Sequence, residues 1–264
     1  SRYHRIPFLS RLVSIFMYQR IYKQLIKAYL AKKGRPDLVH VHVCMRAGLL
    51  ALWAKQKYDL PYVVTEHNSA FLPEAENNIN KLPIFFRRAC LRILKKAADI
   101  SVVSNYLGEA IRSFSGSNYV VIPNVVNTTI FKRNQKDGIA CCRFIHISGL
   151  DENKRPDLIL EALAHARKAN PAMTLVIVGP PSEKIQKKIE VLNLTEAVTV
   201  YPMMPQPELA TILKESDALL LFSRYETFGC VLIGAHACGI PVFANSLPVI
   251  IETVAHGVNG LLVQ

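Results

Sequence analysis

The chain has 264 residues, half of them hydrophobic, which suffices for one large domain or two smaller ones with buried cores. It contains no apolar run of the roughly 18 residues that a membrane span needs, and no secretory signal pattern. The net charge of +12 is uneven: residues 1–132 carry 20 Lys and Arg against 7 Asp and Glu, whereas residues 133–264 carry 12 against 13. The first half is therefore expected to meet an anionic partner or surface.

Residues 1–35 hold nine Lys and Arg and no acidic residue, and apolar residues recur within them at helical spacing. The recurring positions are Leu12, Val13, Phe16, Met17, Ile21, Leu25, Ile26 and Tyr29. A basic helix of this kind either packs its apolar stripe on a sheet or lies on an anionic membrane surface, and both interpretations stay open. A nucleic-acid partner is not expected, because basic and aromatic residues are not interleaved.

After this helix, the first half alternates strands with helices. Strands are expected at 38–43, 62–65, 100–103 and 119–122, and helices at 46–57, 84–96 and 107–114. Residues 68–83 form a loop long enough to suggest a functional role. Residues 123–139 are polar and without a clear period, so they are expected to link an N-terminal domain at 1–122 to a C-terminal domain at 140–264.

The second half restarts the same alternation. Strands are expected at 142–147, 173–178, 198–201, 218–222, 242–244 and 260–263, and helices at 157–169, 182–192, 207–215, 228–239 and 250–255. Strands that alternate with helices throughout predict an α/β protein with parallel sheets.

Six cysteines lie inside apolar runs without forming a Cys-x-x-Cys pair: Cys44, Cys90, Cys141, Cys142, Cys230 and Cys238. This usage is typical of buried free thiols in a reducing cytosol and does not favour a zinc site. A cytoplasmic protein is therefore expected.

The stretch from Ser223 to Pro241 is the strongest candidate for a site on residue types alone. A buried strand runs into a loop with a single acid, Glu226, and a helix is expected to begin near Phe228 and to stop at Gly239. Free backbone N–H groups and the positive end of a helix favour a phosphate, and a nearby carboxylate can hold sugar hydroxyls. Spacing alone favours an ordinary strand-to-helix turn, of which doubly wound folds contain many.

Several segments between Pro36 and Val263 follow one another in a characteristic order and spacing. They are Pro36–His42, Val64–His67, Ala97–Ser104, Val121–Phe131, Ser148–Lys154, Val176–Gly179, Glu226–Gly229, Ala237–Val242 and Gly257–Val263. Together they resemble the retaining glycosyltransferases of family four. The resemblance implies the GT-B fold, with two Rossmann-like domains whose parallel sheets face each other across a cleft. It also implies a fragment, because the family begins well before Pro36 and continues past Val263.

The resemblance implies transfer of a sugar from a nucleotide-diphosphate sugar to a hydroxyl of a lipid-linked or polysaccharide acceptor at the inner membrane face. The nucleotide sugar is a co-substrate, so no cofactor is expected. No metal is expected either, because no Asp-x-Asp is present. Lys154 would face the departing phosphate, where preorganised donors lower the barrier. Glu226 would hold the donor sugar, and His67 would approach the reacting carbon from the facing domain.

Further donor contacts follow from the same resemblance. Thr227, Phe228 and Gly229 adjoin the glutamate, Arg155 adjoins the lysine, and the backbone near Met203 and Met204 is expected to meet the base. Each residue also has a structural interpretation: Lys154 as a solvated lysine, and His67, His40 and His42 as packing or hydrogen-bonding groups.

The chain departs from the family pattern at several positions. Gly234 stands where a second glutamate that holds the ribose is usual, and Gly149 stands where a phosphate-binding arginine is usual. Further departures are Pro248-Val249 for a Gly-Gly pair, although Glu252 is retained, and Val125 and Asn127 in the crossover. Loss of one charge-assisted hydrogen bond typically costs roughly 1.5–3 kcal/mol. The alternative function is thus a weakened or non-catalytic GT-B protein that binds a sugar nucleotide or a partner glycosyltransferase.

Overall fold

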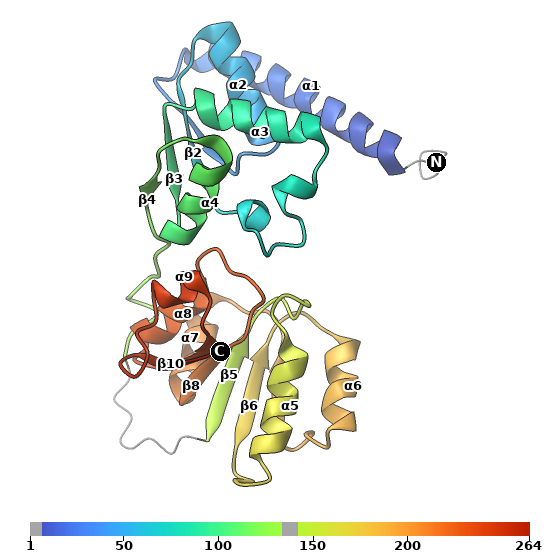
Figure 1. Ribbon diagram of the computed structural model, residues 1–264, viewed down its shortest axis with the longest axis vertical. Coiled ribbons are helices and arrows are strands. Elements are labelled where there is room, and N and C mark those ends of the chain that lie inside the picture. Colours follow the sequence, from blue (N-terminus) through green and yellow to red (C-terminus); the bar gives the residue numbers. More distant parts are fainter. Residues whose placement is uncertain (1–6, 134–141) are drawn as a thin grey trace. The chain divides into compact units, whose positions relative to one another are not determined.

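A computed structural model describes residues 7–133 and 142–264 (Figure 1). The chain divides into two compact units, Ser1–Ile122 and Pro123–Gln264. Each unit is built around one parallel β-sheet with helices packed against it. The start of the expected C-terminal domain at residues 140 and 141, and residues 134–139 of the expected linker, lie outside the described residues.

The first unit carries a four-stranded parallel sheet in the order β1-β2-β3-β4. Its elements are α1 Pro7–Lys33, β1 Val39–His42, α2 Ala47–Tyr58, β2 Tyr62–Glu66, η2 Ser69–Phe71, η3 Ile79–Lys81, α3 Ile84–Lys96, β3 Asp99–Val102, α4 Asn105–Ser115 and β4 Val120–Val121. The structure confirms the strands and helices that the sequence predicts here, with ends shifted by a few residues.

The expected loop 68–83 contains two short 3₁₀ helices, and an asparagine caps each of them. The Asn68 side-chain oxygen accepts a hydrogen bond from the Ala70 N–H (2.8 Å), and the Asn78 oxygen accepts one from the Asn80 N–H (2.8 Å). Capping of this kind satisfies donors that a short helix leaves unpaired, so the segment has a defined conformation.

The apolar positions of α1 are only partly covered. Val13, Ile21 and Tyr29 are exposed, and Phe16 and Leu25 are 67% and 57% exposed. Leu25 and Tyr29, with four further residues of α1, line a groove of about 620 Å³ together with β1 and α2. One side of this helix therefore faces α2 and the first strand of the sheet. In the described part of the chain, no helix is long and apolar enough to cross a membrane.

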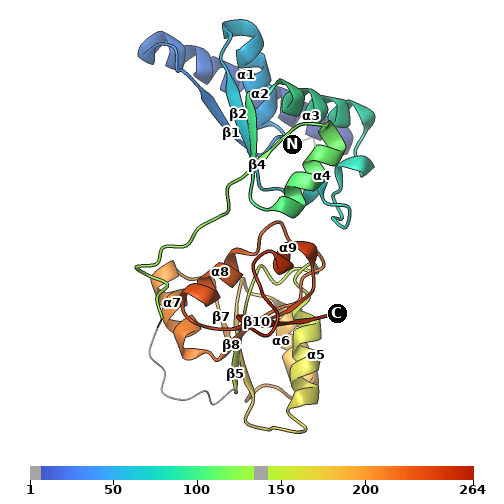
Figure 2. The ribbon, with the colours of Figure 1, turned by 60° about the vertical axis from the view of Figure 1, so that its left-hand side comes forward.

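The second unit carries a six-stranded parallel sheet in the order β10-β9-β8-β5-β6-β7, with α5 and α6 packed side by side along it (Figure 2). Its elements are β5 Arg143–Ile147, α5 Pro156–Ala166, β6 Thr174–Val178, α6 Glu183–Val191, β7 Val198–Tyr201, α7 Gln206–Glu215, β8 Ala218–Leu221, α8 Cys230–Ala237, β9 Val242–Asn245, α9 Pro248–Ile251 and β10 Gly260–Val263. Counted from β5, this is the Rossmann-like order 3-2-1-4-5-6.

The direction of chain progression reverses between the neighbouring strands β5 and β8. In open α/β sheets, ligands bind outside the carboxyl ends of the strands at such a switch point. The topology of the second unit therefore points to the loops that follow β5 and β8.

Three predicted helices of the second unit differ from the structure by two residues or more at one end or both, and α5 is one of them, because it ends at Ala166 and not at Ala169. α8 begins at Cys230, not near Phe228, and it ends at Ala237 before Gly239. The later start follows from Gly229, whose φ of 82° is left-handed and outside the helical region. α9 covers Pro248–Ile251 in place of the expected 250–255.

Candidate functional site

The candidate site of the second unit is formed by two loops at the carboxyl ends of β5 and β8. The lysine loop, residues 148–155, follows β5, and the glutamate loop, residues 222–229, follows β8. Both loops therefore lie at the switch point of the sheet. From the adjacent strands β5 and β8, the chain continues toward opposite edges of the sheet.

Asn153 holds the two loops together. Its side-chain amide donates to the Tyr225 carbonyl (3.1 Å) and accepts from the Tyr225 N–H (3.1 Å), while its own carbonyl accepts from the Arg224 N–H (2.8 Å). These three hydrogen bonds fix the register of one loop against the other. The lysine and the glutamate are thereby brought together across 72 positions of sequence.

Lys154 and Glu226 form an ion pair at this junction. The Lys154 ammonium donates to Oε1 of Glu226, and the Ser223 hydroxyl donates to the same oxygen (2.7 Å). The two charged side chains are only 22% and 9% exposed. Both of these donors are side chains, so hydroxyls of a ligand can replace them without unfolding the backbone.

A buried histidine on β5 holds the start of the lysine loop through hydrogen bonds. His146, on β5, is fully buried; its Nδ1 lies 2.9 Å from the Leu220 carbonyl, and its Nε2 lies 2.8 Å from the Ser148 hydroxyl. A carbonyl only accepts, so Nδ1 carries the proton and Nε2 accepts from Ser148. The Ser148 oxygen in turn accepts from the Leu150 N–H (3.0 Å).

The same histidine is held neutral. Burial lowers the pKa of His146 from 6.5 to about 4; the hydrogen bond to Leu220 opposes this shift, and the charge of Lys154 adds to it. A neutral imidazole is the form that can donate to Leu220 and accept from Ser148 at once. The chain of hydrogen bonds therefore runs from β8 through β5 into the lysine loop.

The lysine loop carries two residues in the left-handed backbone region, Leu150 (φ 55°) and Arg155 (φ 49°). Such conformations cost of order 1–3 kcal/mol each and persist only where the surroundings determine them. The turn also approaches the end of β6 closely: a Cβ on Gly179 would lie 2.6 Å from Leu150 Cγ and 2.7 Å from the Ser148 carbonyl. The absence of a side chain at Gly179 thus permits this turn.

A pocket of about 410 Å³ lies between this turn, the start of α6 and the end of β7. It is lined by Leu150, Gly179, Pro181, Ser182, Glu183, Ile185, Gln186, Val200, Tyr201 and Pro202. Met203 is 68% exposed and follows β7, two strands away from β5, as does Met204. Neither methionine is brought to the lysine–glutamate pair, although the pocket reaches the residue just before them.

The remaining predicted donor contacts are distributed around the glutamate. Thr227 is half-buried, Phe228 is buried, and Gly229 occupies the turn before α8. Arg155 is half-buried and directly precedes α5.

Gly234 is buried in the middle of α8, where a Cβ would lie in ordinary contact with the Phe131 ring, 3.7 Å from Cε1. Gly149 is exposed, and a Cβ there would meet only Asp151 Oδ2, at 3.5 Å. Both positions therefore have room for a small side chain.

In the first unit, three histidines form a row on β1 and after β2. His42 Nδ1 lies 3.1 Å from His67 Nε2, and His40 Nε2 lies 2.7 Å from the Thr65 hydroxyl. Burial lowers the pKa of His67, and the neighbouring His42 and His40 lower it further. A neutral His67 is therefore favoured, and His40 and His42 are hydrogen-bonding residues of this row.

Glu66 lies beside this row and is completely buried. Its carboxylate accepts from three backbone N–H groups: Cys44 (2.8 Å), His67 (3.0 Å) and Asn68 (2.8 Å). Burial raises the pKa of Glu66, and the three N–H groups oppose that shift. Glu66 thus ties the loop after β1 to the loop after β2 and orients the backbone that carries His67.

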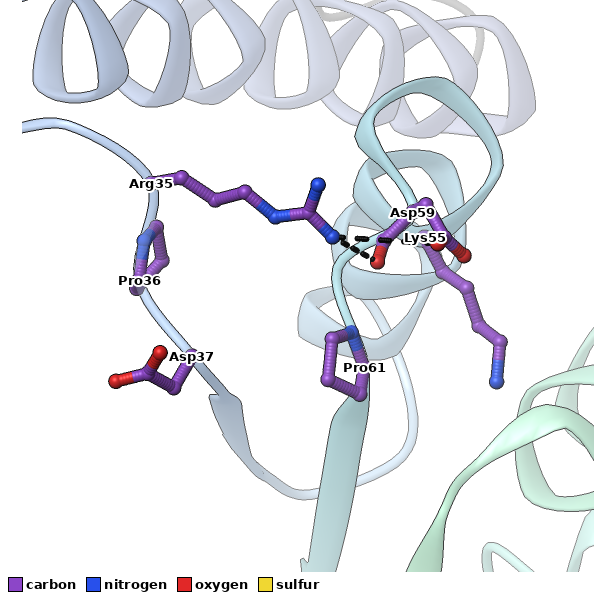
Figure 3. A pocket seen from close by; sticks show the side chains of 6 residues that line it. All are labelled: Arg35, Pro36, Asp37, Lys55, Asp59 and Pro61. Atoms are coloured by element: carbon purple, nitrogen blue, oxygen red, sulfur yellow. Dashed lines mark hydrogen bonds and ion pairs between the residues drawn. The ribbon is translucent and has the colours of Figure 1, made fainter.

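A further pocket of the first unit, of about 450 Å³, opens at the opposite end of its sheet (Figure 3). It is lined by Arg35, Pro36, Asp37, Lys55, Asp59 and Pro61. Asp37 and Pro61 stand before β1 and β2, so this pocket lies at the amino ends of parallel strands. The Arg35 guanidinium donates to the Asp59 carbonyl (2.7 Å) in a surface contact, and this end of a sheet is not where such folds place their sites.

The cysteines of the described residues are unpaired. Cys44, Cys90, Cys142, Cys230 and Cys238 are free, and Cys141 lies outside the described residues. Cys230 is exposed and Cys142 half-buried, which corrects the expectation of burial; Cys230 begins α8 at the surface. Within residues 7–133 and 142–264, no three His, Cys, Asp or Glu are placed to hold a metal ion.

Sequence reasoning missed the residues that assemble the site: His146, Ser148, Asn153 and Ser223. His146 alone left a signal, as a polar residue between the apolar neighbours Ile145 and Ile147 of an expected strand. The other three are small polar residues in loops, and their partners are distant in sequence.

Comparison with known families matches both halves of the chain. The profile described as Glycosyltransferase Family 4 matches residues 2–130, and the profile described as Glycosyl transferases group 1 matches residues 142–264. D-inositol 3-phosphate glycosyltransferase of Acidothermus cellulolyticus is 28% identical over 88% of the chain and 57% of its own length. An uncharacterised 41.2 kDa protein of the Klebsiella pneumoniae cps region is 27% identical over 88% of the chain and 66% of its length. The chain thus spans about three fifths of the length of these relatives.

Solved structures show the same fold. Sucrose-phosphate synthase from Thermosynechococcus elongatus superimposes with a TM-score of 0.80 at 21% identity, over the whole chain and 68% of that protein. Anabaena HepE in complex with UDP-glucose gives a TM-score of 0.71 at 23% identity, over 86% of the chain and 64% of that protein.

Proposed function

Because the chain belongs to the glycosyltransferases of family four and has the GT-B fold, we propose that it transfers a sugar from a nucleotide-diphosphate sugar to an acceptor hydroxyl with retention of anomeric configuration. The observation that carries the proposal is the Lys154–Glu226 pair at the switch point of the second unit. HepE, which binds UDP-glucose, shares this fold and supports a nucleotide sugar as donor.

Lys154 is proposed to contact the departing diphosphate. In the proposed reaction, the bond from the anomeric carbon to the diphosphate breaks, a bond to the acceptor oxygen forms, and the hydroxyl proton ends on the nucleoside diphosphate. Negative charge gathers on the departing diphosphate, and a half-buried ammonium held by an ordered loop stabilises it at little reorganisation cost. The loop and this cation supply the positive field without a metal ion.

Glu226 is proposed to hold hydroxyls of the donor sugar. Its Oε1 accepts from the side chains of Lys154 and Ser223, and in the proposed complex hydroxyls of the sugar take the place of these donors. Thr227, Phe228 and Gly229 form the adjoining wall.

The nucleoside is proposed to occupy the neighbouring pocket of about 410 Å³. Its walls include the Leu150 turn and the end of β7, and the backbone leading into Met203 and Met204 continues from that end. Arg155 adds charge beside the phosphates.

His67 is proposed to approach the reacting carbon from the first unit. Its depressed pKa favours the neutral ring, which accepts or donates a hydrogen bond without placing a cation beside the developing positive charge of the sugar. Glu66 fixes the backbone of His67 and so its direction.

The acceptor is proposed to be a lipid-linked or polysaccharide hydroxyl at the inner face of a membrane. Two observations support this: the excess of 13 positive charges in residues 1–132, and the exposed apolar residues Phe16 and Leu25 on α1. Free thiols in the described residues support a cytoplasmic location.

A second function is favoured by one observation. Gly234 offers no carboxylate for a ribose, and Gly149 offers no guanidinium for a phosphate, so the protein would bind a sugar nucleotide or a partner glycosyltransferase without turnover. Loss of one charge-assisted hydrogen bond weakens donor binding by about one to two decades, which alone does not abolish transfer.

The test begins with a thermal-shift screen of UDP, GDP and ADP, followed by transfer and donor-hydrolysis assays with the matching sugars, with and without EDTA. We expect one nucleotide to stabilise the protein, and the anomeric configuration of the product to be retained by NMR. Lys154→Ala should lower kcat about 100- to 1000-fold. Lys168→Ala, which removes the same charge from an exposed position, should leave kcat unchanged. Nucleotide binding without transfer or hydrolysis for any sugar would instead establish the non-catalytic alternative.

A further inference from the structure

The first unit contains a pocket that the proposed reaction does not use. It measures about 530 Å³ and lies between the 3₁₀ helices η2 and η3, the first turns of α3, and α4. Its walls combine apolar side chains with two arginines: Phe71, Ile79, Ile84, Arg87, Arg88 and Phe114. A volume of this size is typical of small-molecule sites.

The guanidinium of Arg87 has a buried nitrogen that indicates a ligand site. Its Nε is buried and, among the described residues, has no hydrogen-bond partner. A buried donor without an acceptor is rare in folded proteins and costs about 1–3 kcal/mol. An acceptor supplied from outside the chain would remove this cost.

The geometry of a guanidinium narrows the kind of acceptor. Nε–H and the adjacent terminal N–H point in parallel and match two oxygens of one carboxylate or phosphate. Arg88 adds a second cation to the same wall, and none of the residues that line the pocket is acidic. The pocket is therefore electrostatically suited to an oxyanion.

Most of the remaining lining is apolar, and its polar members, Asn78, Asn80 and Ser113, are uncharged. Phe71, Ile79, Ile84 and Phe114 offer no charged group, and Asn78 is already engaged through its amide, which donates to the Leu72 carbonyl (2.6 Å). A bare inorganic ion would leave this apolar surface in contact with water. The lining fits a ligand with an apolar body next to its charged head.

We propose that this pocket binds an oxyanion, a phosphate monoester or a carboxylate, that carries an apolar chain. The Arg87 guanidinium holds the head through Nε–H and a terminal N–H, and Ile84 and the aromatic residues cover the chain. The site belongs to the first unit, and its occupation requires neither a nucleotide sugar nor turnover.

The test is isothermal titration calorimetry of the purified protein with octyl phosphate below its micelle concentration, and separately with octanoate, inorganic phosphate and octanol. We expect one saturable site for octyl phosphate or octanoate, at least about 10-fold tighter than for inorganic phosphate or octanol, since each lacks one half of the ligand. Equal affinities for all four probes, or no saturable binding, would overturn the proposal.

Variants separate directed hydrogen bonds from charge. Arg87→Gln should weaken binding about 10- to 100-fold, and Arg87→Lys, which keeps the charge but loses the fork, about 10-fold. Arg92→Gln is the matched control, because Arg92 is exposed on the same helix and lies outside the pocket. An equal loss in Arg92→Gln would show that only net charge matters and would overturn the site.

Two further measurements test the apolar part of the pocket and the source of the ligand. Ile84→Ala alters a residue that is 56% exposed, so folding is preserved, and it should weaken octyl phosphate several-fold without changing inorganic phosphate. Vesicles with anionic lipid distinguish a headgroup from a soluble ligand. Wild type and Arg87→Gln could bind vesicles equally well while monomeric octyl phosphate does not bind. That result would show that the arginines serve a membrane surface, and it would overturn the proposed oxyanion site in the pocket.

Discussion

Each unit buries one glutamate near the carboxyl end of a parallel strand, and the two are held in opposite ways. Glu66, at the end of β2, accepts hydrogen bonds from three backbone N–H groups. Glu226, after β8, is held by the side chains of Lys154 and Ser223. Donors on the main chain cannot leave without rearranging two loops, whereas side-chain donors can rotate away. A buried acid at the end of a strand is therefore a candidate for ligand binding when its hydrogen-bond partners are exchangeable side chains.

The largest expected difference between the two glutamates is in stability. Glu66→Ala removes the acceptor of three backbone N–H groups, one in a buried and two in part-buried hydrogen bonds, and should lower the free energy of unfolding by about 4 kcal/mol. Glu226→Ala leaves a partly exposed lysine and should cost about 1 kcal/mol. Urea unfolding, followed by circular dichroism and by fluorescence of Trp53 in the first unit, measures both. Equal losses would show that the two carboxylates are held alike.

A second prediction tests whether His146 supports the glutamate site. Its folded pKa of about 4 lies below the usual 6.5, so the unfolded chain takes up a proton first as the pH falls. The contribution of the neutral His146 to the free energy of unfolding should therefore be fully present above pH 6.5. It should fall by about 3 kcal/mol as the pH drops toward 4. His146→Gln should flatten this slope. His165→Gln, at an exposed position of α5, should keep the wild-type slope; an unchanged slope in both variants would contradict the buried neutral imidazole.

The third prediction concerns the strained turn beside that histidine. Gly179→Ala would place a Cβ 2.6 Å from Leu150 Cγ and 2.7 Å from the Ser148 carbonyl, and should lower the free energy of unfolding by about 2 kcal/mol. Gly149→Ala is the control; it lies in the lysine loop that Gly179 approaches, and the nearest atom to its added Cβ is Asp151 Oδ2 at 3.5 Å. Equal changes in the free energy of unfolding for both substitutions, measured by thermal unfolding, would show that the turn can rearrange without cost.

The smallest expected effect is a gain. Gly234 lies within α8 with room for a Cβ against Phe131, so Gly234→Ala should stabilise the protein by about 0.5–1 kcal/mol. Gly229→Ala should instead destabilise it, because φ is 82° and Leu232 Cδ1 would lie 2.8 Å from the new carbon. Chemical denaturation compares the pair, and a loss in Gly234→Ala would show that the helix tolerates no side chain there.

The strands, helices and parallel sheets could be predicted because they depend on local periodicity. The start of α8 could not be placed, since it depends on the left-handed backbone of Gly229, and a sequence does not display φ. Lys154 and Glu226 were predicted as separate contacts through a family resemblance. Their direct pairing, and its support by Asn153 and His146, depends on the neighbouring positions of β5 and β8, which only the sheet order reveals.

The pairing of β5 with β8 also has a consequence for how the protein folds. Strands β6 and β7 lie between them in sequence, so Lys154 and Glu226 meet only when a loop of 72 positions has closed. Closure entropy opposes such long-range contacts early in folding. We therefore expect the Lys154–Glu226 pair and the two loops that carry it to be among the last parts of the second unit to form. A nucleotide added during refolding would then capture only chains whose central sheet is already complete.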